Sequence, residues 1–217
     1  MFFSKIRIMA GVLALSASPQ AASQAMAMVQ DGPSTANLAQ ATDPVETAKE
    51  YAKTLTDNAT AALTNEAASE AEKLAAFQQV LADGLALDVI GKFMLGESRK
   101  TMSQAQLDRY FAVFPKYITK QYADQFSEIV GRPLKITDAK AIGKRDVIVR
   151  TQFERNDGSP VLVDWRVRRL RSGEQKAIDI IVSGVSVMLV KREEFSSFIA
   201  LNGIDALLDT LEADAAA

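Results

Sequence analysis

The chain has 217 residues and a formal net charge of −2, and it contains neither histidine nor cysteine. Without an imidazole there is no general base for a Ser-His-Asp triad near neutral pH, and without a thiol there is neither a cysteine nucleophile nor a thiolate zinc site. These absences disfavour most hydrolase and metal chemistry, so we expect no cofactor and no metal. A mildly acidic chain is also a poor nucleic-acid binder.

The N-terminus has the pattern of a cleaved export signal. Lys5 and Arg7 precede an apolar stretch over residues 8–17, and the small residues that follow offer Ala22, Ala25 and Ala27 as competing cleavage positions. The apolar stretch is shorter than the roughly twenty residues that cross a bilayer. Loss of the two basic residues changes the net charge from −2 to −4.

We therefore expect residues 1–27 to be a signal peptide and residues 28–42, rich in Ala, Gln and Ser, to be a flexible leader. The mature protein would then be exported and soluble, in the periplasm if the source is a bacterium and in the secretory pathway if it is a eukaryote.

Four helices are predicted between residue 43 and residue 131. Asp43 caps the first, Ser69 with Glu72 forms a capping box for the second, and Ser103 with Gln106 does so for the fourth. Apolar residues recur at spacings of three and four in each helix. The predicted stripes are Val45, Ala48, Ala52, Leu55, Ala59 and Leu63; Leu74, Phe77, Val80 and Leu81; Val89, Ile90, Phe93 and Met94; and Leu107, Phe111, Phe114, Ile118, Tyr122 and Phe126.

Glycine and proline residues mark the expected ends of these helices and one expected kink. Gly84 and Gly96 are expected to end the second and third helices. Pro115 interrupts the fourth and predicts a kink, because it removes one backbone donor and crowds the preceding turn. Gly131 and Pro133 are expected to close that helix.

After residue 133 the apolar period changes from 3.6 to 2, which predicts strands at 134–142, 146–154, 161–170 and 175–183. The turns between them are short, so the strands form an antiparallel meander. Alternation places apolar residues on one face and polar residues on the other, where opposite charges can pair across strands. The expected apolar face holds Val147, Val149, Phe153, Val161, Val163, Trp165, Val167, Ile178, Ile180 and Val182, and the polar face Arg150, Gln152, Asp164, Arg166, Arg168 and Asp179.

Two further helices are predicted, from Arg192 to Leu201 and from Ile204 to Leu211. The fold class is therefore α+β, a four-stranded antiparallel meander with helices packed on its apolar face. Residues 43–211 would form one domain, and residues 212–217 a frayed tail.

Gly184-Val185-Ser186 suggests two opposite roles. A serine at the end of a strand could be a nucleophile, with Lys191 as the nearest base, but Met188 stands where a nucleophile elbow has its second glycine. The alternative is a hinge at Gly184 and Ser186, where the strand turns into the next segment. We favour the hinge and expect no enzymatic activity.

Three stretches resemble the MlaC family, the periplasmic phospholipid-shuttle proteins of the Gram-negative lipid-asymmetry pathway, also called toluene-tolerance proteins. They are Leu87-Asp88-Val89-Ile90 through Leu95-Gly96; Ser103-Gln104-Ala105-Gln106-Leu107 through Tyr110-Phe111; and Ala177 to Ser186 followed by Arg192-Glu193-Glu194-Phe195. The sequence departs from the family pattern at Ser183, where Glu is usual, at Ser98, where an aromatic is common, and at Pro115.

The resemblance implies an apolar cavity, enclosed by sheet and helices, that takes the acyl tails of a phospholipid. Burying about thirty CH₂ groups is worth more than about 20 kcal/mol gross, so lipid needs a dry container to cross water. The implied partners are an outer-membrane lipoprotein complex and an inner-membrane ABC transporter with its membrane-anchored substrate-binding subunit. We expect a monomer.

Tail contacts are predicted at the middle of the sheet face and on the helices expected to cover it. The residues are Val149, Val163, Trp165, Val167, Ile178 and Ile180, opposite Phe93, Phe111, Phe114 and Ile118. Two alternatives stay open: a carrier of hopanoid-type lipid, and a non-catalytic periplasmic interaction domain with a filled core.

Overall fold

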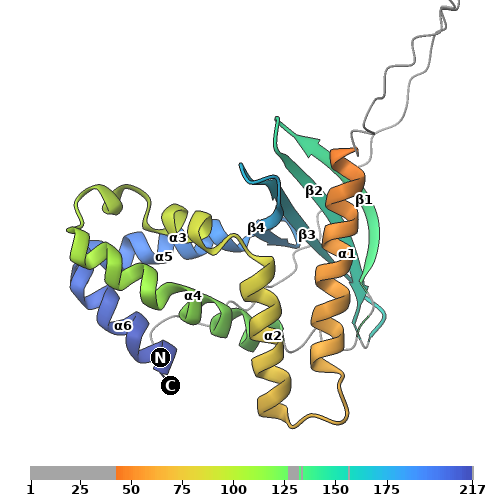
Figure 1. The fold of residues 1–217 in the computed structure, drawn as a ribbon, viewed down its shortest axis with the longest axis horizontal. Helices are drawn as coiled ribbons and strands as arrows, with labels where there is room; N and C mark the ends of the chain where they lie inside the picture. The colour runs from red at the N-terminus through yellow and green to blue at the C-terminus, as the bar shows by residue number, and fades with distance from the viewer. Residues whose placement is uncertain (1–42, 127–131, 133, 156, 217) are drawn as a thin grey trace, which may run out of the picture.

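The computed structural model describes residues 43–126, 132, 134–155 and 157–216. The predicted signal peptide and leader lie outside the described residues, and so do Gly131 and Pro133, which were expected to close the long helix. Within the described part, helices and a sheet form the α+β fold that the sequence predicted (Figure 1).

The first, second and fourth helices begin at the predicted caps Asp43, Ser69 and Ser103. The helices that precede the sheet are α1 (Pro44–Leu63), α2 (Glu70–Gly84), α3 (Leu87–Leu95), a 3₁₀ turn η1 (Gly96–Lys100) and α4 (Gln104–Phe126). Asp43 accepts a hydrogen bond from the Val45 N–H at 2.9 Å. At α2 the Ser69 N–H donates to Glu72 at 2.8 Å and the Glu72 N–H donates to the Ser69 hydroxyl at 3.3 Å, which confirms the capping box. Pro115 lies inside α4, and the helix continues on both sides of it.

The sheet has five strands rather than the predicted four. In the order β1-β2-β3-β4-β5 it is an antiparallel meander of β1 (Lys135–Ile142), β2 (Asp146–Glu154), β3 (Pro160–Arg169), β4 (Gln175–Val182) and β5 (Val185–Ser186). The extra strand β5 is only two residues long and pairs with Ile181 and Val182. So short a strand has no alternation, which is why the sequence pattern missed it.

The turn into β5 uses two consecutive residues with positive φ, Ser183 at 49° and Gly184 at 84°. This pair matches a two-residue hairpin turn, in which both central residues need positive φ. We predict that Gly184→Ala lowers the free energy of unfolding by about 1 kcal/mol through backbone strain alone, because no atom lies within 4 Å of the added Cβ. Urea unfolding checks this. Gly184→Asn should recover part of the loss, and an alanine variant as stable as wild type would contradict it.

A β-bulge changes the predicted face of β4. Arg166 pairs with Asp179, whereas the next residue, Val167, pairs with Ala177, so Ile178 has no partner in the ladder. The alternation shifts there: Ala177 and Ile180 are fully buried, while Ile178 is half-buried. The prediction that Ile178 shares the buried face with Ile180 is therefore wrong, because the bulge inserts one residue between them.

The polar face carries the expected cross-strand charge pairs. The Arg166 and Arg168 guanidinium groups converge on the Asp146 carboxylate, with nitrogen-to-oxygen distances of 2.6–2.9 Å. The Asp146 side chain is 6% exposed. Burial, which opposes ionisation, is the largest single influence, but the bonds from Arg168 and Arg166 outweigh it and hold the pKa of Asp146 below its ordinary value.

The helices cover the apolar face in two groups. The helix α1 contacts all four long strands, and α2 lies beside α1 as the second arm of a helical hairpin (Figure 1). The helices α3, α4, α5 and α6 form a second group next to them, in which α4 packs on α6 and α3 packs on α5. Thus α1, rather than α4, is the main cover of the sheet.

The last two helices differ from prediction at their ends. The helix α5 (Val187–Asn202) begins five residues before the predicted Arg192, and α6 (Ile204–Ala216) continues through the segment predicted to fray. In that segment Ala215 is buried, and Glu212 accepts hydrogen bonds from Arg109 of α4 at 2.5 and 2.7 Å. These contacts hold the end of α6 against α4.

Candidate functional site

An apolar pocket lies between the α1–α2 hairpin and the sheet. Its volume is about 50 Å³. The helices α1 and α2 supply one wall, and strand β3 supplies the opposite wall. Arg132 and Leu134, which precede β1, complete the pocket. The lining consists of Leu55, Thr56, Ala59, Thr60, Leu63, Phe77, Leu81, Arg132, Leu134, Val163 and Trp165.

The few polar groups of the lining differ in how they are satisfied. The Thr56 hydroxyl donates to the Ala52 carbonyl at 2.8 Å, and the Arg132 guanidinium donates to the Glu154 carbonyl at 2.6 Å. The Trp165 side chain is nearly buried, at 7% exposure, and among the described residues its indole N–H has no hydrogen-bond partner. The walls are otherwise chiefly apolar, which suits hydrocarbon.

Of the predicted tail contacts, Val163 and Trp165 line the pocket. Val149, Val167 and Ile180 are fully buried in the same core cluster, but they do not line this pocket. Ile178 lies at the bulge. The structure therefore brings together two of the six sheet residues that were expected to touch a tail.

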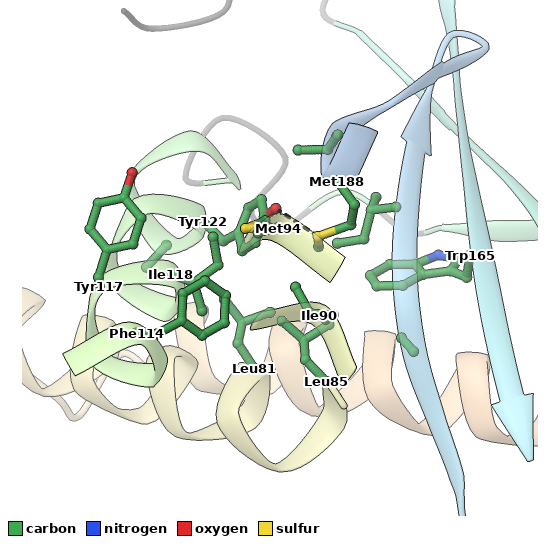
Figure 2. Packing of buried hydrophobic residues seen from close by; sticks show 14 of the residues in the cluster. Leu81, Leu85, Ile90, Met94, Phe114, Tyr117, Ile118, Tyr122, Trp165 and Met188 are labelled. Carbon is green, nitrogen blue, oxygen red and sulfur yellow. Dashed lines mark hydrogen bonds between the residues drawn. The ribbon is translucent and has the colours of Figure 1, made fainter. Parts of the chain in front are cut away.

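The helical residues of the prediction lie elsewhere. Phe114 and Ile118 are fully buried on α4, but in Figure 2 Leu81, Leu85 and Ile90 lie between them and Trp165. Phe114 stacks on Tyr110 with ring centroids 5.1 Å apart. The prediction that α4 faces the sheet across a cavity is therefore wrong, because α2 and α3 intervene.

The other two predicted contacts, Phe93 and Phe111, also lie outside the pocket lining. Phe111 is partly buried on α4, where its ring contacts Tyr110 edge-on at 5.1 Å. Phe93 is 39% exposed, and the Arg192 guanidinium stacks over its ring at 4.8 Å. Phe93 thus belongs to a surface contact between α3 and α5.

Sequence reasoning missed most of the pocket lining. Leu55, Ala59 and Leu63 belong to the apolar stripe predicted for the first helix, and Phe77 and Leu81 to that of the second. Their periodicity correctly predicted an inward face. It could not show that this face meets β3 across a void, since a stripe that fills a core has the same spacing.

The pocket is much smaller than the predicted cavity. Pockets that hold drug-sized ligands measure roughly 300–1,000 Å³, against about 50 Å³ here. The structure does not show the enclosed cavity for acyl tails that the sequence predicted. The same apolar side chains that would contact a tail pack against one another instead.

Ser186 is the N-cap of α5. Its hydroxyl accepts a hydrogen bond from the Leu189 N–H at 3.0 Å and donates one to Asp179 at 2.6 Å. Asp179 also accepts from the Met188 N–H at 3.2 Å, so it is buried at the start of α5, on the face that it shares with its cross-strand partner Arg166 as alternation predicted. Burial raises the pKa of Asp179, and the Ser186 hydrogen bond partly opposes that rise.

We predict that Ser186→Ala lowers the free energy of unfolding by about 1 kcal/mol and leaves lipid content unchanged. The variant loses a helix cap and one bond to Asp179, and Ser186 is not part of the pocket lining. Urea unfolding and the amount of lipid extracted per mole of protein measure the two effects. Loss of an ester-hydrolysing activity in this variant would instead support the nucleophile role.

A protein-family model, that of the MlaC protein, matches residues 53–213. The match covers more than half of the chain. This chain belongs to the MlaC family. It is 26% identical over 132 residues to the intermembrane phospholipid transport system binding protein MlaC of Haemophilus influenzae, an alignment that covers 59% of this chain and 62% of that relative. The matched part is thus less than two thirds of the relative's length.

A solved structure with a similar fold is the phospholipid-binding protein of Ralstonia solanacearum in complex with a phospholipid. The TM-score is 0.65 at 20% sequence identity, over 78% of this chain and 97% of that one. At this identity the likeness establishes a shared fold.

Two of the MlaC-like stretches meet in the fold. Gly96, with φ of 52°, ends α3, and a Cβ there would lie 3.1 Å from the Arg192 guanidinium, so the Leu-Gly and Arg-x-x-Phe stretches pack together. Asp179 and Ser186 of the third stretch cap α5.

In the described ranges no helix has the length and apolarity to span a membrane, and those ranges contain no acidic, His or Cys cluster that could hold a metal ion.

Proposed function

We propose that this MlaC-family protein is a periplasmic carrier that holds phospholipid acyl tails between the α1–α2 hairpin and the sheet and moves the lipid between the outer and inner membranes. The observation that carries the proposal is the apolar pocket at that interface, with side chains from both helices on one wall and Val163 and Trp165 on the other. The phospholipid named for the relative and for the structural neighbour supports the same ligand class.

The pocket must widen to admit a tail, and we propose that the α1–α2 hairpin pivots about one of its ends. At one end the hairpin is tied down: the Tyr51 hydroxyl donates to the Gly84 carbonyl, and the Ala86 N–H donates to the Ala177 carbonyl of β4 at 2.9 Å. Burial raises the pKa of Tyr51 to about 12, so its hydroxyl remains a donor at any physiological pH.

The opposite end of the hairpin is the connection between Leu63 and Glu70, and Leu63 lines the pocket. We propose that this end moves away from β1 and β3 while the tied end stays in place. Hydrocarbon replaces the side-chain contacts that are lost, so the net cost of opening is small compared with the gain from burying a tail.

The wider setting rests on the N-terminal pattern and on the family. Residues 1–27 would direct export and be removed, residues 28–42 would be a leader, and residues 43–211 would form the lipid-binding domain. Donor and acceptor would be an outer-membrane lipoprotein complex and an inner-membrane ABC transporter with its membrane-anchored substrate-binding subunit. A carrier that only encloses tails needs no catalytic group, which agrees with the capping role of Ser186.

Native mass spectrometry of the exported protein, followed by solvent extraction, tests the proposal. We expect one phospholipid per chain and an N-terminus at residue 23, 26 or 28. A stoichiometric polycyclic lipid would favour the hopanoid alternative. A protein that carries no lipid, and binds none when phospholipid vesicles are supplied, would contradict the proposal and favour an interaction domain.

A further inference from the structure

Trp165 lines the pocket, and its indole N–H is a buried hydrogen-bond donor. It has no partner among the described residues, and the side chain is 7% exposed. Buried donors in folded proteins almost always have an acceptor, and an unmet one costs free energy comparable to a lost hydrogen bond. A phenylalanine or leucine at this position would bury an apolar side chain without that cost.

None of the residues that the structure describes accepts a hydrogen bond from this donor. The neighbouring strand residues Val149 and Ile180, directly paired with Trp165, carry hydrocarbon side chains. Across the pocket, Leu55, Phe77 and Leu81 are also hydrocarbon. The polar side chains of the lining are those of Thr56, Thr60 and Arg132, and the Thr56 and Arg132 groups donate to backbone carbonyls. An acceptor that arrives with the ligand would satisfy the indole N–H.

The chemistry of the proposed ligand limits what that acceptor can be. In a glycerophospholipid the groups that accept hydrogen bonds next to the hydrocarbon are the carbonyl oxygens of the acyl esters. The phosphate is charged, and burial among apolar side chains would be far more costly for it than for a neutral carbonyl. An ester carbonyl can enter the pocket with its tail and accept from the indole without exposing a charge.

We propose that the Trp165 N–H donates a hydrogen bond to an acyl carbonyl oxygen of the bound lipid. The protein then selects ester-linked over ether-linked tails. This inference rests on the proposed function. An ether-linked lipid has the same tails and headgroup but no carbonyl, so it leaves the donor unmet in the bound state. Free fatty acids also carry an acyl carbonyl, and the experiment separates the two sources.

The test compares diacyl phosphatidylethanolamine, dialkyl phosphatidylethanolamine of equal chain length, and oleate. Each displaces a pyrene-labelled phospholipid from the delipidated protein. We expect the wild type to prefer the diacyl over the dialkyl lipid by about tenfold, the value of one hydrogen bond in place of an unmet donor. In Trp165→Phe the ratio should fall to about one.

The ratio is measured within each variant, so a general loss of stability or of pocket shape cancels. Tyr110→Phe is the matched control: it removes a buried donor, whose acceptor is the Gly91 carbonyl at 3.2 Å, outside the pocket lining, and it should keep the tenfold preference. A second readout needs no variant. The ultraviolet resonance Raman band that reports indole hydrogen bonding should shift with diacyl lipid and not with dialkyl lipid, and this chain has a single tryptophan.

Equal affinity of the wild type for diacyl and dialkyl lipid would overturn the inference and leave the carrier function standing. The same conclusion follows if Trp165→Phe keeps the preference, or if only oleate binding depends on Trp165. If neither phospholipid displaces the probe, the proposed function itself fails.

Discussion

Replacing Ala59 by phenylalanine should abolish the lipid content of the protein. Ala59 lines the pocket from α1, and a benzyl group there would occupy more than the roughly 50 Å³ that the pocket offers. We expect the fraction of chains carrying phospholipid, measured by native mass spectrometry, to fall at least about tenfold. The added ring is apolar and half-buried, so the cost to stability should stay within the roughly 1–3 kcal/mol of an overpacked core.

The matched control is Ala61→Phe. Ala61 lies two residues further along the same helix and is exposed, so it presents the same added ring to solvent. This variant should keep its lipid. If Ala59→Phe fails to fold, Ala59→Leu should give a smaller loss of the same kind. Full lipid occupancy in a folded Ala59→Phe protein would place the tails somewhere other than this pocket.

Asp146→Asn should lower the free energy of unfolding by about 2 kcal/mol at neutral pH. In the wild type Arg166 and Arg168 bond the buried carboxylate of Asp146. In the variant they face an uncharged amide. Removing one partner of a buried pair typically costs 3–5 kcal/mol. The Arg166 and Arg168 side chains are 39% and 27% exposed, so solvent screening reduces the value.

The pKa of Asp146 determines how the stability difference between wild type and Asp146→Asn changes with pH. The folded pKa of Asp146 lies below its unfolded value of about 4, so its contribution is complete above that pH and is lost as the pH falls through the folded pKa. Urea unfolding should therefore separate wild type from Asp146→Asn at pH 7 and bring them together in acid. Asp138→Asn removes an exposed partner of Arg150, at 3.5 Å, and should change stability by less than about 0.5 kcal/mol. An equal effect of the two substitutions would contradict this account.

Local signals predicted the frame of the fold. Asp43, Ser69 and Ser103 cap their helices as expected, because a side-chain oxygen next to an apolar stripe satisfies amides that the helix leaves open. The three hairpins of the long strands also follow from turn residues and alternation. In both cases the determining contacts lie within a few residues along the chain.

Errors arose where a distant contact decides the local structure. Val187 to Val190 continue an apolar run and resemble the end of a strand, yet they open α5, because Ser186 and Asp179 together cap it. Ile178 fits the alternation of β4, but the bulge at Arg166 and Val167 leaves Ile178 without a partner in the ladder. Neither the cap partner seven residues away nor the bulge leaves a periodic signal.

The candidate site was predicted least well, for a related reason. The stripes of α1, α2 and α4 are equivalent in the sequence, and only the tertiary arrangement assigns α1 to the sheet, α2 to the pocket beside it and α4 to the second layer. Val163 and Trp165 were identified because they occupy the centre of the buried sheet face. The unmet donor of Trp165 is a property of its surroundings and has no sequence signature.

The most direct test of tail binding between the α1–α2 hairpin and the sheet uses the fluorescence of Trp165, the chain's single tryptophan. Phospholipid with brominated acyl chains quenches an indole that it touches. We predict strong quenching when this lipid occupies the wild-type protein, and unchanged emission with a lipid brominated only in its headgroup. Full occupancy by the chain-brominated lipid, verified by native mass spectrometry, with no loss of Trp165 emission would show that the tails bind elsewhere.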